Sequence, residues 1–94
     1  MIQSFKDKET QRLYNGFFSK KLPQAIQKVA LRKLMMINNS ATLDDLRVPP
    51  ANRLEALAGS RKGQYSIRVN DQYRICFRFA DGNAYDVEIV DYHH

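Results

Sequence analysis

Hydrophobic positions recur every three to four residues in the first half of the chain and every second residue in the second half. A first helix is expected over residues 6–14, because Asn15-Gly16 forms a common stop signal. A second helix is expected after Pro23. Its apolar residues fall on one helical face: Ile26, Val29, Ala30, Leu34 and Ile37.

Shorter elements are expected around these helices. Residues 2–5 fit a short opening strand, and Phe17 and Phe18 are expected to anchor the turn between the helices in the core. Thr42 and Asp45 have the spacing of a capping box, which predicts one or two helical turns before Pro49-Pro50.

Strict alternation marks the second half as strands, expected over residues 53–57, 65–69, 73–79 and 85–90. Asp81-Gly82 is a strong hairpin signal, so neighbouring strands should pair antiparallel. One face should pack on the helices through Tyr65, Ile67, Ile75, Phe77, Val87 and Ile89. The pattern predicts an α+β fold in one domain over 1–94, an antiparallel sheet with two N-terminal helices on one face.

The opposite face of the predicted sheet carries Arg68, Arg74 and Arg78 across from Asp86 and Glu88. One interpretation is a set of cross-strand ion pairs, favoured for Arg78 beside the acidic strand. The other is an anion-binding surface, favoured for Arg68 and Arg74, which have fewer obvious partners. Arginine suits such a surface because its planar fork binds phosphate.

Composition narrows the class of protein. The chain of 94 residues has a net charge of +5, with a basic excess in 1–33 and 47–78 and an acidic end in 79–94. This balance suggests a polyanionic partner. A single cysteine, Cys76, allows no internal disulfide and no cysteine-based zinc motif, and no metal set or cofactor is expected. Without an apparent signal peptide or membrane span, a cytoplasmic location is expected.

Three segments stand in an order that carries a resemblance: NRLEALAG at 52–59, GQYSIRVNDQYRICF at 63–77 and DVEIVDYH at 86–93. Together with the opening MIQSF, they resemble the HigB-type toxins of the RelE/ParE superfamily, which belong to bacterial type II toxin–antitoxin systems. The resemblance covers essentially the whole chain. It implies a RelE-like domain, in agreement with the fold expected from the alternation.

The resemblance also implies an activity and partners. Such toxins are ribosome-dependent endoribonucleases that cut messenger RNA, by a metal-free reaction in which a ribose 2′-OH attacks the adjacent phosphate. The implied partners are the ribosome, messenger RNA and a HigA-type helix-turn-helix antitoxin, with operator DNA bound only through the antitoxin. Toxins of the ParE type instead poison DNA gyrase, and a non-catalytic binding role with the antitoxin is a further alternative.

The resemblance implies site residues at the positions that match the family's motifs. Asp91, Tyr92 and His93 fall on the family's C-terminal catalytic group, and Arg74 falls on a strand arginine, although Tyr73 replaces the usual tryptophan. Glu55 stands where many HigB toxins have a catalytic histidine, and this departure bears on the strength of catalysis. Further RNA-binding candidates are Arg53, Arg61, Lys62 and Arg68.

The chemistry suits these side chains, because 2′-OH attack needs a proton acceptor, a charge stabiliser and a proton donor. His93 can act as base or acid and Glu55 as a base, while Asp91 can orient His93. Tyr92 can hydrogen-bond a phosphate oxygen or stack on a base. The alternative interpretations are ordinary packing for Tyr92 and an ion pair with Arg53 or Arg61 for Glu55.

Overall fold

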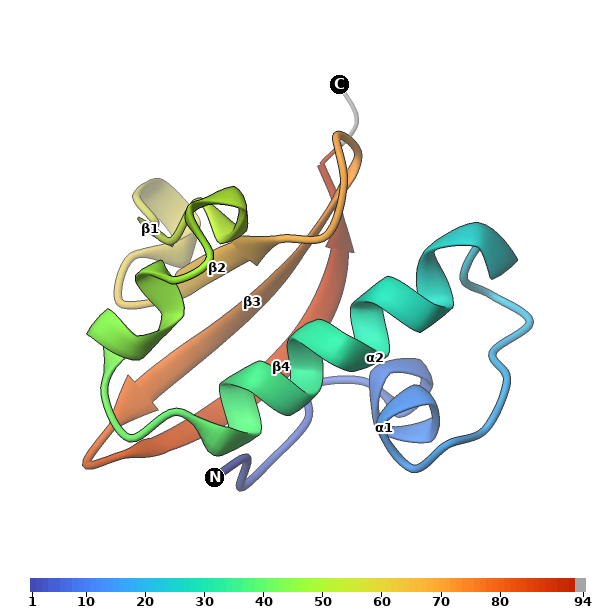
Figure 1. Cartoon of the computed structure of the whole chain (residues 1–94), viewed down its shortest axis with the longest axis horizontal. Coiled ribbons are helices and arrows are strands. Elements are labelled where there is room, and N and C mark those ends of the chain that lie inside the picture. The colour runs from blue at the N-terminus through green and yellow to red at the C-terminus, as the bar shows by residue number, and fades with distance from the viewer. Residues whose placement is uncertain (93–94) are drawn as a thin grey trace.

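The structure, a computed structural model, describes residues 1–92, and its helices and strands follow the order expected from the sequence (Figure 1). His93 lies outside the described residues. The helices are α1 (Lys8–Tyr14) and α2 (Gln24–Asn39), with short 3₁₀ turns η1 (Leu43–Arg47), η2 (Pro50–Asn52) and η3 (Gly59–Arg61). The strands are β1 (Glu55–Ala56), β2 (Tyr65–Arg68), β3 (Tyr73–Ala80) and β4 (Asn83–Asp91).

The helix ends match the capping signals in the sequence. The Asp7 side chain accepts a hydrogen bond from the Thr10 amide at the start of α1, and Gly16 adopts a φ of +90° just beyond its end. The predicted capping box is also confirmed, because Thr42 and Asp45 bond each other's backbone amides at η1. The two backbone amides bound by Asp45 lower the pKa of its carboxyl.

Four strands form one antiparallel sheet in the order β1-β2-β3-β4. Asp81 and Gly82 both have positive φ, 52° and 79°, as a tight hairpin between β3 and β4 requires. β1 contains only two residues, fewer than the five expected, and it pairs Glu55 with Ser66.

A bulge in β4 corrects the alternation expected there. Cys76 pairs with Glu88 but Arg78 pairs with Tyr85, so β4 carries one extra residue, and Asp86 has a φ of 53°. The bulge turns Ala84 into the core and leaves Tyr85 exposed. A simple period of two placed Tyr85 on the same face as Val87, which is wrong.

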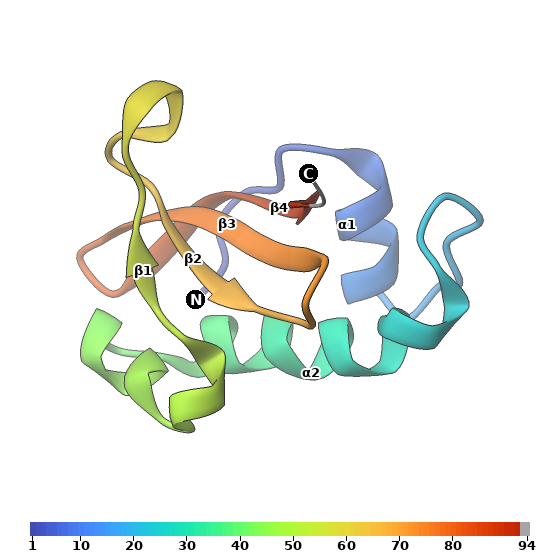
Figure 2. The same ribbon diagram turned by 90° about the horizontal axis from the view of Figure 1, so that it is seen from above.

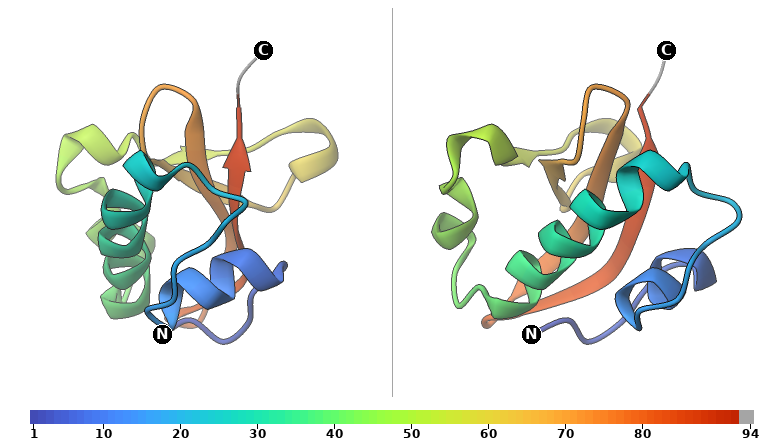
Figure 3. Two further views of the ribbon diagram at one scale, coloured as in Figure 1. Left: turned by 90° about the vertical axis from the view of Figure 1, so that its right-hand side faces the viewer. Right: turned by 45° about the vertical axis from the view of Figure 1, so that its right-hand side comes forward.

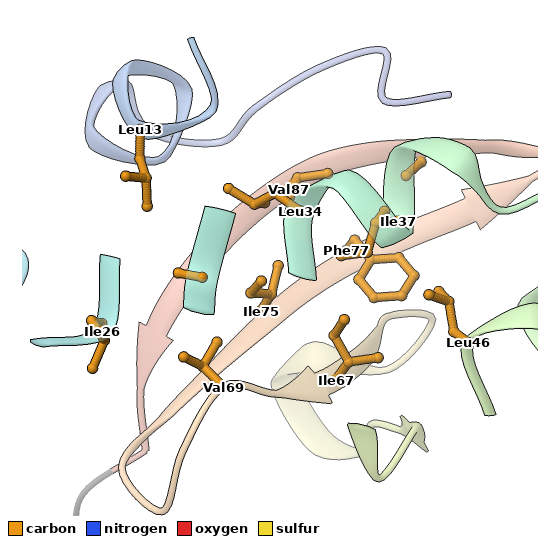
Figure 4. Close-up of a cluster of buried hydrophobic side chains, with 12 residues drawn as sticks. Leu13, Ile26, Leu34, Ile37, Leu46, Ile67, Val69, Ile75, Phe77 and Val87 are labelled. Atoms are coloured by element: carbon orange, nitrogen blue, oxygen red, sulfur yellow. The ribbon is translucent and has the colours of Figure 1, made fainter. Parts of the chain in front are cut away.

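The core lies between the helices and one face of the sheet (Figures 2 and 4). Leu34 and Ile37 of α2 meet Ile67, Ile75 and Phe77 of the strands, all fully buried. Burying a side chain of this size contributes about 1.5–3 kcal/mol before the entropy cost of ordering it. The predicted α+β arrangement, with both helices on one face, is confirmed.

The segment between the helices departs from the prediction. Phe17 and Phe18 are 59% and 55% exposed instead of anchoring the turn in the core. Buried Ser19 occupies the inward position, and its backbone is held by the Gln27 side chain. A polar network therefore fixes this turn where apolar burial was expected.

The N-terminal segment runs along the outer edge of β4. It forms two isolated parallel bridges, Ile2 with Ala84 and Phe5 with Val87, in place of the short strand expected over residues 2–5. Further along the same edge, the Ile89 amide donates to Thr10 Oγ1 of α1 at 3.0 Å. Among residues 1–92, no helix is long and apolar enough to cross a membrane.

Candidate active site

A polar hollow of about 310 Å³ opens on the sheet face that carries the strand arginines, away from the core. It lies between β1, the turn that joins β2 to β3, and the end of β4. The Tyr92 amide donates to the Gln72 carbonyl at 2.6 Å and so holds the end of β4 beside that turn. The end of β4 beside that turn is visible in Figures 1 and 3. The lining residues are Arg53, Glu55, Arg68, Asn70, Asp71, Arg74 and Tyr92.

Arg74 is the most firmly held of the lining side chains. Its Nε donates to Ser66 Oγ at 2.7 Å, and its terminal nitrogen donates to the Arg53 carbonyl at 2.5 Å. Only 9% of the residue is exposed. The expectation that Arg74 lacks obvious partners is therefore wrong. These bonds fix the guanidinium in one orientation, so it can stabilise charge without reorganising.

Arg53 and Glu55 enter the hollow from the segment that joins η2 to β1. Arg53 adopts left-handed backbone geometry, with a φ of 45°, and its amide bonds the Pro50 carbonyl at the end of η2. Glu55 Oε1 lies 3.8 Å from an Arg74 terminal nitrogen. The ion pair forms with Arg74 instead of Arg53 or Arg61, the partners considered from sequence. More than half of the Glu55 side chain stays exposed, so it remains accessible to a ligand.

Arg68 ends β2 and pairs with Asp71 in the following turn. The Asp71 side chain is 99% exposed, and a pair this open to solvent restrains Arg68 weakly. Burial, followed by the charges of Arg32 and Arg68, lowers the pKa of the Lys33 ammonium. The hollow therefore has a fixed arginine, Arg74, beside an adaptable one, Arg68.

Tyr92 is one of the lining residues, and its hydroxyl contacts the Cys76 sulfur at 3.6 Å. Burial, followed by the contact with Cys76, raises the pKa of Tyr92 to about 12. The phenol therefore keeps its proton at neutral pH and cannot act there as a general base. Burial likewise raises the pKa of the Cys76 thiol.

Arg61 is the last residue of the η3 turn, and Lys62 follows it. Arg61 donates to Glu88 at 2.8 Å and to the Gln64 side chain at 3.0 Å, so it supports this face beside the hollow. Lys62 is exposed and does not line the hollow. Arg78 pairs with Asp86 at 3.6 Å, as the alternation indicated.

The structure thus brings together five of the nine residues nominated from sequence: Arg53, Glu55, Arg68, Arg74 and Tyr92. Asp91 pairs with Tyr73 in the sheet and accepts from Gln72 Nε2 at 3.2 Å, at the edge of this region. His93 lies beyond the described residues.

Sequence reasoning missed several supporting residues. Ser66 orients Arg74, Cys76 contacts Tyr92, and buried Asn52 receives Lys33 and donates to the Leu46 carbonyl at 3.2 Å. Cys76 is fully buried, although its strand parity suggested a solvated face. Ser66, Cys76 and Asn52 all belong to segments that carry the resemblance, but no pattern within those segments marked them as supporting residues.

The fold and this arginine-lined hollow define a toxin domain of the RelE-like class. A YoeB-YefM toxin–antitoxin complex from Staphylococcus aureus superposes with a TM-score of 0.62 over 100% of this chain and 99% of the matched one. That match is 17% identical and shows the fold.

The family of this chain is more specific than the fold class. The family model described as the RelE-like toxin of type II toxin–antitoxin system HigB matches residues 3–93, and the chain belongs to this family.

Two curated relatives cover most of the chain. Toxin HigB-1 of Vibrio cholerae is 42% identical over 85 residues, which are 89% of this chain and 90% of the relative. Endoribonuclease HigB of Proteus vulgaris is 33% identical over 94 residues, covering 99% of this chain and all of that protein. The chain is therefore a toxin of a type II toxin–antitoxin system, as the resemblance implied.

Proposed function

We propose that the chain is a ribosome-dependent endoribonuclease that cuts messenger RNA, with the scissile linkage bound in the hollow around Arg74. The observation that carries this proposal is the meeting of three arginines, a carboxylate and an aromatic ring in one concave site. An RNA backbone needs cationic partners for its phosphates and planar partners for unstacked bases, and this lining offers both. A Proteus vulgaris relative is itself named an endoribonuclease.

The proposed reaction is attack of a ribose 2′-OH on the adjacent phosphate. Glu55 accepts the 2′-OH proton, while Arg74 and Arg68 stabilise the negative charge on the phosphorane. The bond to the 5′ oxygen breaks, and His93 supplies the proton that this oxygen takes up. Asp91 orients His93. The products are a 2′,3′-cyclic phosphate and a free 5′ hydroxyl.

Tyr92 has a restricted role in this proposal. Its hydroxyl is engaged by Cys76 and its phenol stays protonated, so its ring face is the part offered to RNA. Stacking on an aromatic ring contributes about 1–3 kcal/mol per base. Of the two roles considered from sequence, the contact with Cys76 favours stacking on a base over a hydrogen bond to a phosphate oxygen.

The proposed partners follow from the family. An antitoxin neutralises the toxin, and we assign it to the HigA type with a helix-turn-helix, through which operator DNA is bound. Arg53, Arg61 and Lys62 would contact RNA around the hollow, in a complex with the ribosome. A gene for a helix-turn-helix protein beside the toxin gene would support this pairing, and a neighbour of another fold would contradict it.

The test is messenger cleavage in a reconstituted translation reaction, with 5′ ends mapped by primer extension. Arg68→Gln should lower the cleavage rate on the order of tenfold to a hundredfold, because it removes a charged donor from the transition state. Glu55→Gln should lower it by a similar factor. Arg78→Gln is the matched control, since Arg78 lies on the same face but pairs with Asp86 outside the hollow.

Each outcome separates the alternatives. Cleavage by Arg78→Gln should equal that of the native chain, and cleavage without ribosomes should be absent. Undiminished cleavage by both Arg68→Gln and Glu55→Gln would overturn the assignment of the hollow. DNA damage with intact messenger would point instead to gyrase poisoning.

A non-catalytic binding role is the second candidate, favoured by the contact between Glu55 and Arg74. A carboxylate held by arginine is a weaker base than a free one. If growth arrest occurs with no new messenger 5′ ends, and survives substitution of both Tyr92 and His93, this second role is correct.

A further inference from the structure

Phe17 and Phe18 are exposed and belong to the segment between α1 and α2. That segment runs along the right-hand side of Figure 1. Phe17 and Phe18 line a hollow of about 260 Å³ together with Leu13 and Leu31. Phe18 also borders a second hollow of about 440 Å³, so the two adjoin. We call this surface the aromatic patch: Phe17, Phe18 and Leu31 with the surrounding cations Arg12, Lys20, Lys21 and Lys28. It shares no residue with the arginine-lined hollow.

The turn that presents these rings is built to hold its shape. Ser19 is fully buried, and its amide donates to Gln27 Oε1 at 3.1 Å. Gln27 Nε2 donates in return to the carbonyls of Ser19 and Leu22, at 2.7 and 2.9 Å. Ser19 Oγ donates to Glu9 at 2.6 Å. Buried polar bonds already fix the backbone of this turn. The two exposed rings therefore forgo apolar burial and add nothing to the stability of the turn.

Positive charge predominates around the aromatic patch, although the Glu9 carboxylate also lines one of the hollows. Four cations border it, and the nearby carboxylate of Glu9 is engaged by Ser19. A ligand that fills the hollows with apolar side chains and carries acidic groups at their rim would satisfy both features. Such complementarity favours fast association and fixes the register of a partner.

We propose that the aromatic patch docks an acidic segment of the antitoxin, with apolar side chains inserted beside Phe17 and Phe18. The proposal rests on membership of the toxin–antitoxin family and not on the catalytic roles assigned above. Rigid aromatic anchors surrounded by charged residues are the usual centres of binding energy in protein interfaces.

The geometry favours a protein segment over RNA at this surface. The Arg12 guanidinium lies 5.6 Å from the centre of the Phe17 ring and already occupies one of its faces. The hollow beside the rings is lined by leucines, which suit aliphatic side chains better than hydrated phosphates. Ribosomal RNA is therefore an alternative occupant that the experiment must separate.

The experiment measures the affinity of the full-length toxin for the purified antitoxin encoded beside it, by isothermal titration calorimetry. Phe17→Ser with Phe18→Ser should weaken binding about 30-fold or more, since two anchors are lost. Met35→Ser with Val48→Ser is the matched control, because these side chains are 51% and 72% exposed beside a separate hollow. Lys20→Glu with Lys21→Glu tests the charged rim. This variant should bind the antitoxin more weakly than the native chain does, and the difference in affinity should shrink as salt rises.

Ribosome association and messenger cleavage are measured on the same variants, so that failure of the catalytic proposal is recognised separately. The expected result is weak antitoxin binding with native ribosome association for the phenylalanine variant, and native antitoxin affinity for the control. Native antitoxin affinity of the phenylalanine variant would overturn the proposal. Loss of ribosome association alone would assign the patch to RNA, and an equal loss in the control would show a nonspecific effect.

Discussion

Among single side chains, Arg74 shows how a buried cation is prepared for an anion. A hydroxyl and two carbonyl groups orient its guanidinium, and the Glu55 carboxylate forms a loose ion pair with it at 3.8 Å. A phosphate that enters the hollow competes with Glu55 for this charge. Cross-strand position accounts for the orienting hydroxyl, because Ser66 and Arg74 lie on the same face of adjacent strands.

Removing the Ser66 hydroxyl should distinguish the effect of Arg74's orientation from the effect of its charge. Ser66→Ala deletes the acceptor of a bond from a buried charged group, so we expect the free energy of unfolding to fall by about 2 kcal/mol. The cleavage rate should fall about tenfold, because Arg74 keeps its charge but loses its fixed direction. Urea unfolding and primer extension measure the two quantities. Stability lost without any loss of cleavage would refute the positioning role of Ser66.

Tyr92 should titrate apart from the other tyrosines. Its pKa is raised from 10.0 to about 12, because burial disfavours the phenolate. The folded state therefore holds this proton longer than the unfolded state does. The stability that Tyr92 contributes is fully present below pH 10 and is lost as the pH rises toward 12.

A near-ultraviolet titration of the native chain minus that of Tyr92→Phe checks this value. The difference curve should have its midpoint near 12 in the folded protein and near 10 in urea. A folded midpoint near 10 would show that the phenol is open to solvent and free to act on a ligand.

At the level of helices and turns, α2 anchors the short η2 turn that leads to the hollow. Lys33, 6% exposed, donates to Asn52, which is fully buried and also bonds the Leu46 carbonyl. Arg53 follows directly, so this contact positions one wall of the hollow from the opposite layer of the fold. The charge of Lys33 suggested a solvated position, but Lys33 follows Ile26 by seven residues, so helical geometry places it on the buried face of α2.

Loss of the Lys33–Asn52 contact should lower the free energy of unfolding most when the acceptor is removed and the buried cation stays. Asn52→Ala leaves a buried ammonium without its acceptor and should lower the free energy of unfolding by about 3 kcal/mol. Lys33→Met in the Asn52→Ala background removes the stranded charge and should recover part of that loss. Chemical unfolding of the single and double variants measures the coupling. Additive losses would show that the two side chains do not interact.

Taken as one body, the protein gathers Arg53, Arg68 and Arg74 on the surface where we propose that RNA binds. We expect the affinity of the cleavage-deficient Glu55→Gln protein for ribosomes to fall as salt rises, because counterions return to the phosphates. Arg68→Gln should reduce the slope of log affinity against log salt by about 1. Filter binding at several salt concentrations measures this slope. An unchanged slope for Arg68→Gln would remove Arg68 from the RNA contact.

Periodicity was enough to predict the second helix, the three longer strands and the helix-covered face, while the first helix was predicted from its stop signal Asn15-Gly16. It failed where an irregularity broke the period, at the Asp86 bulge that exposes Tyr85, and where polar bonds replaced apolar burial, at Ser19 beside Phe17. The hollow needed the family resemblance, because its walls come from segments far apart in sequence. Burial of Cys76 could not be read from strand parity, since it depends on the later segments that cover that face.

The first residues of the chain have a protective consequence. Met1 to Lys6 hydrogen-bond the outer edge of β4 through Ala84 and Val87, and Thr10 continues the cover at Ile89. Deleting this segment would bare a row of unpaired amides and carbonyls, a ready template for another copy's strand. These residues therefore protect the edge of β4 from pairing with another copy of the chain. A leader sequence fused to Met1 would disturb this protection first.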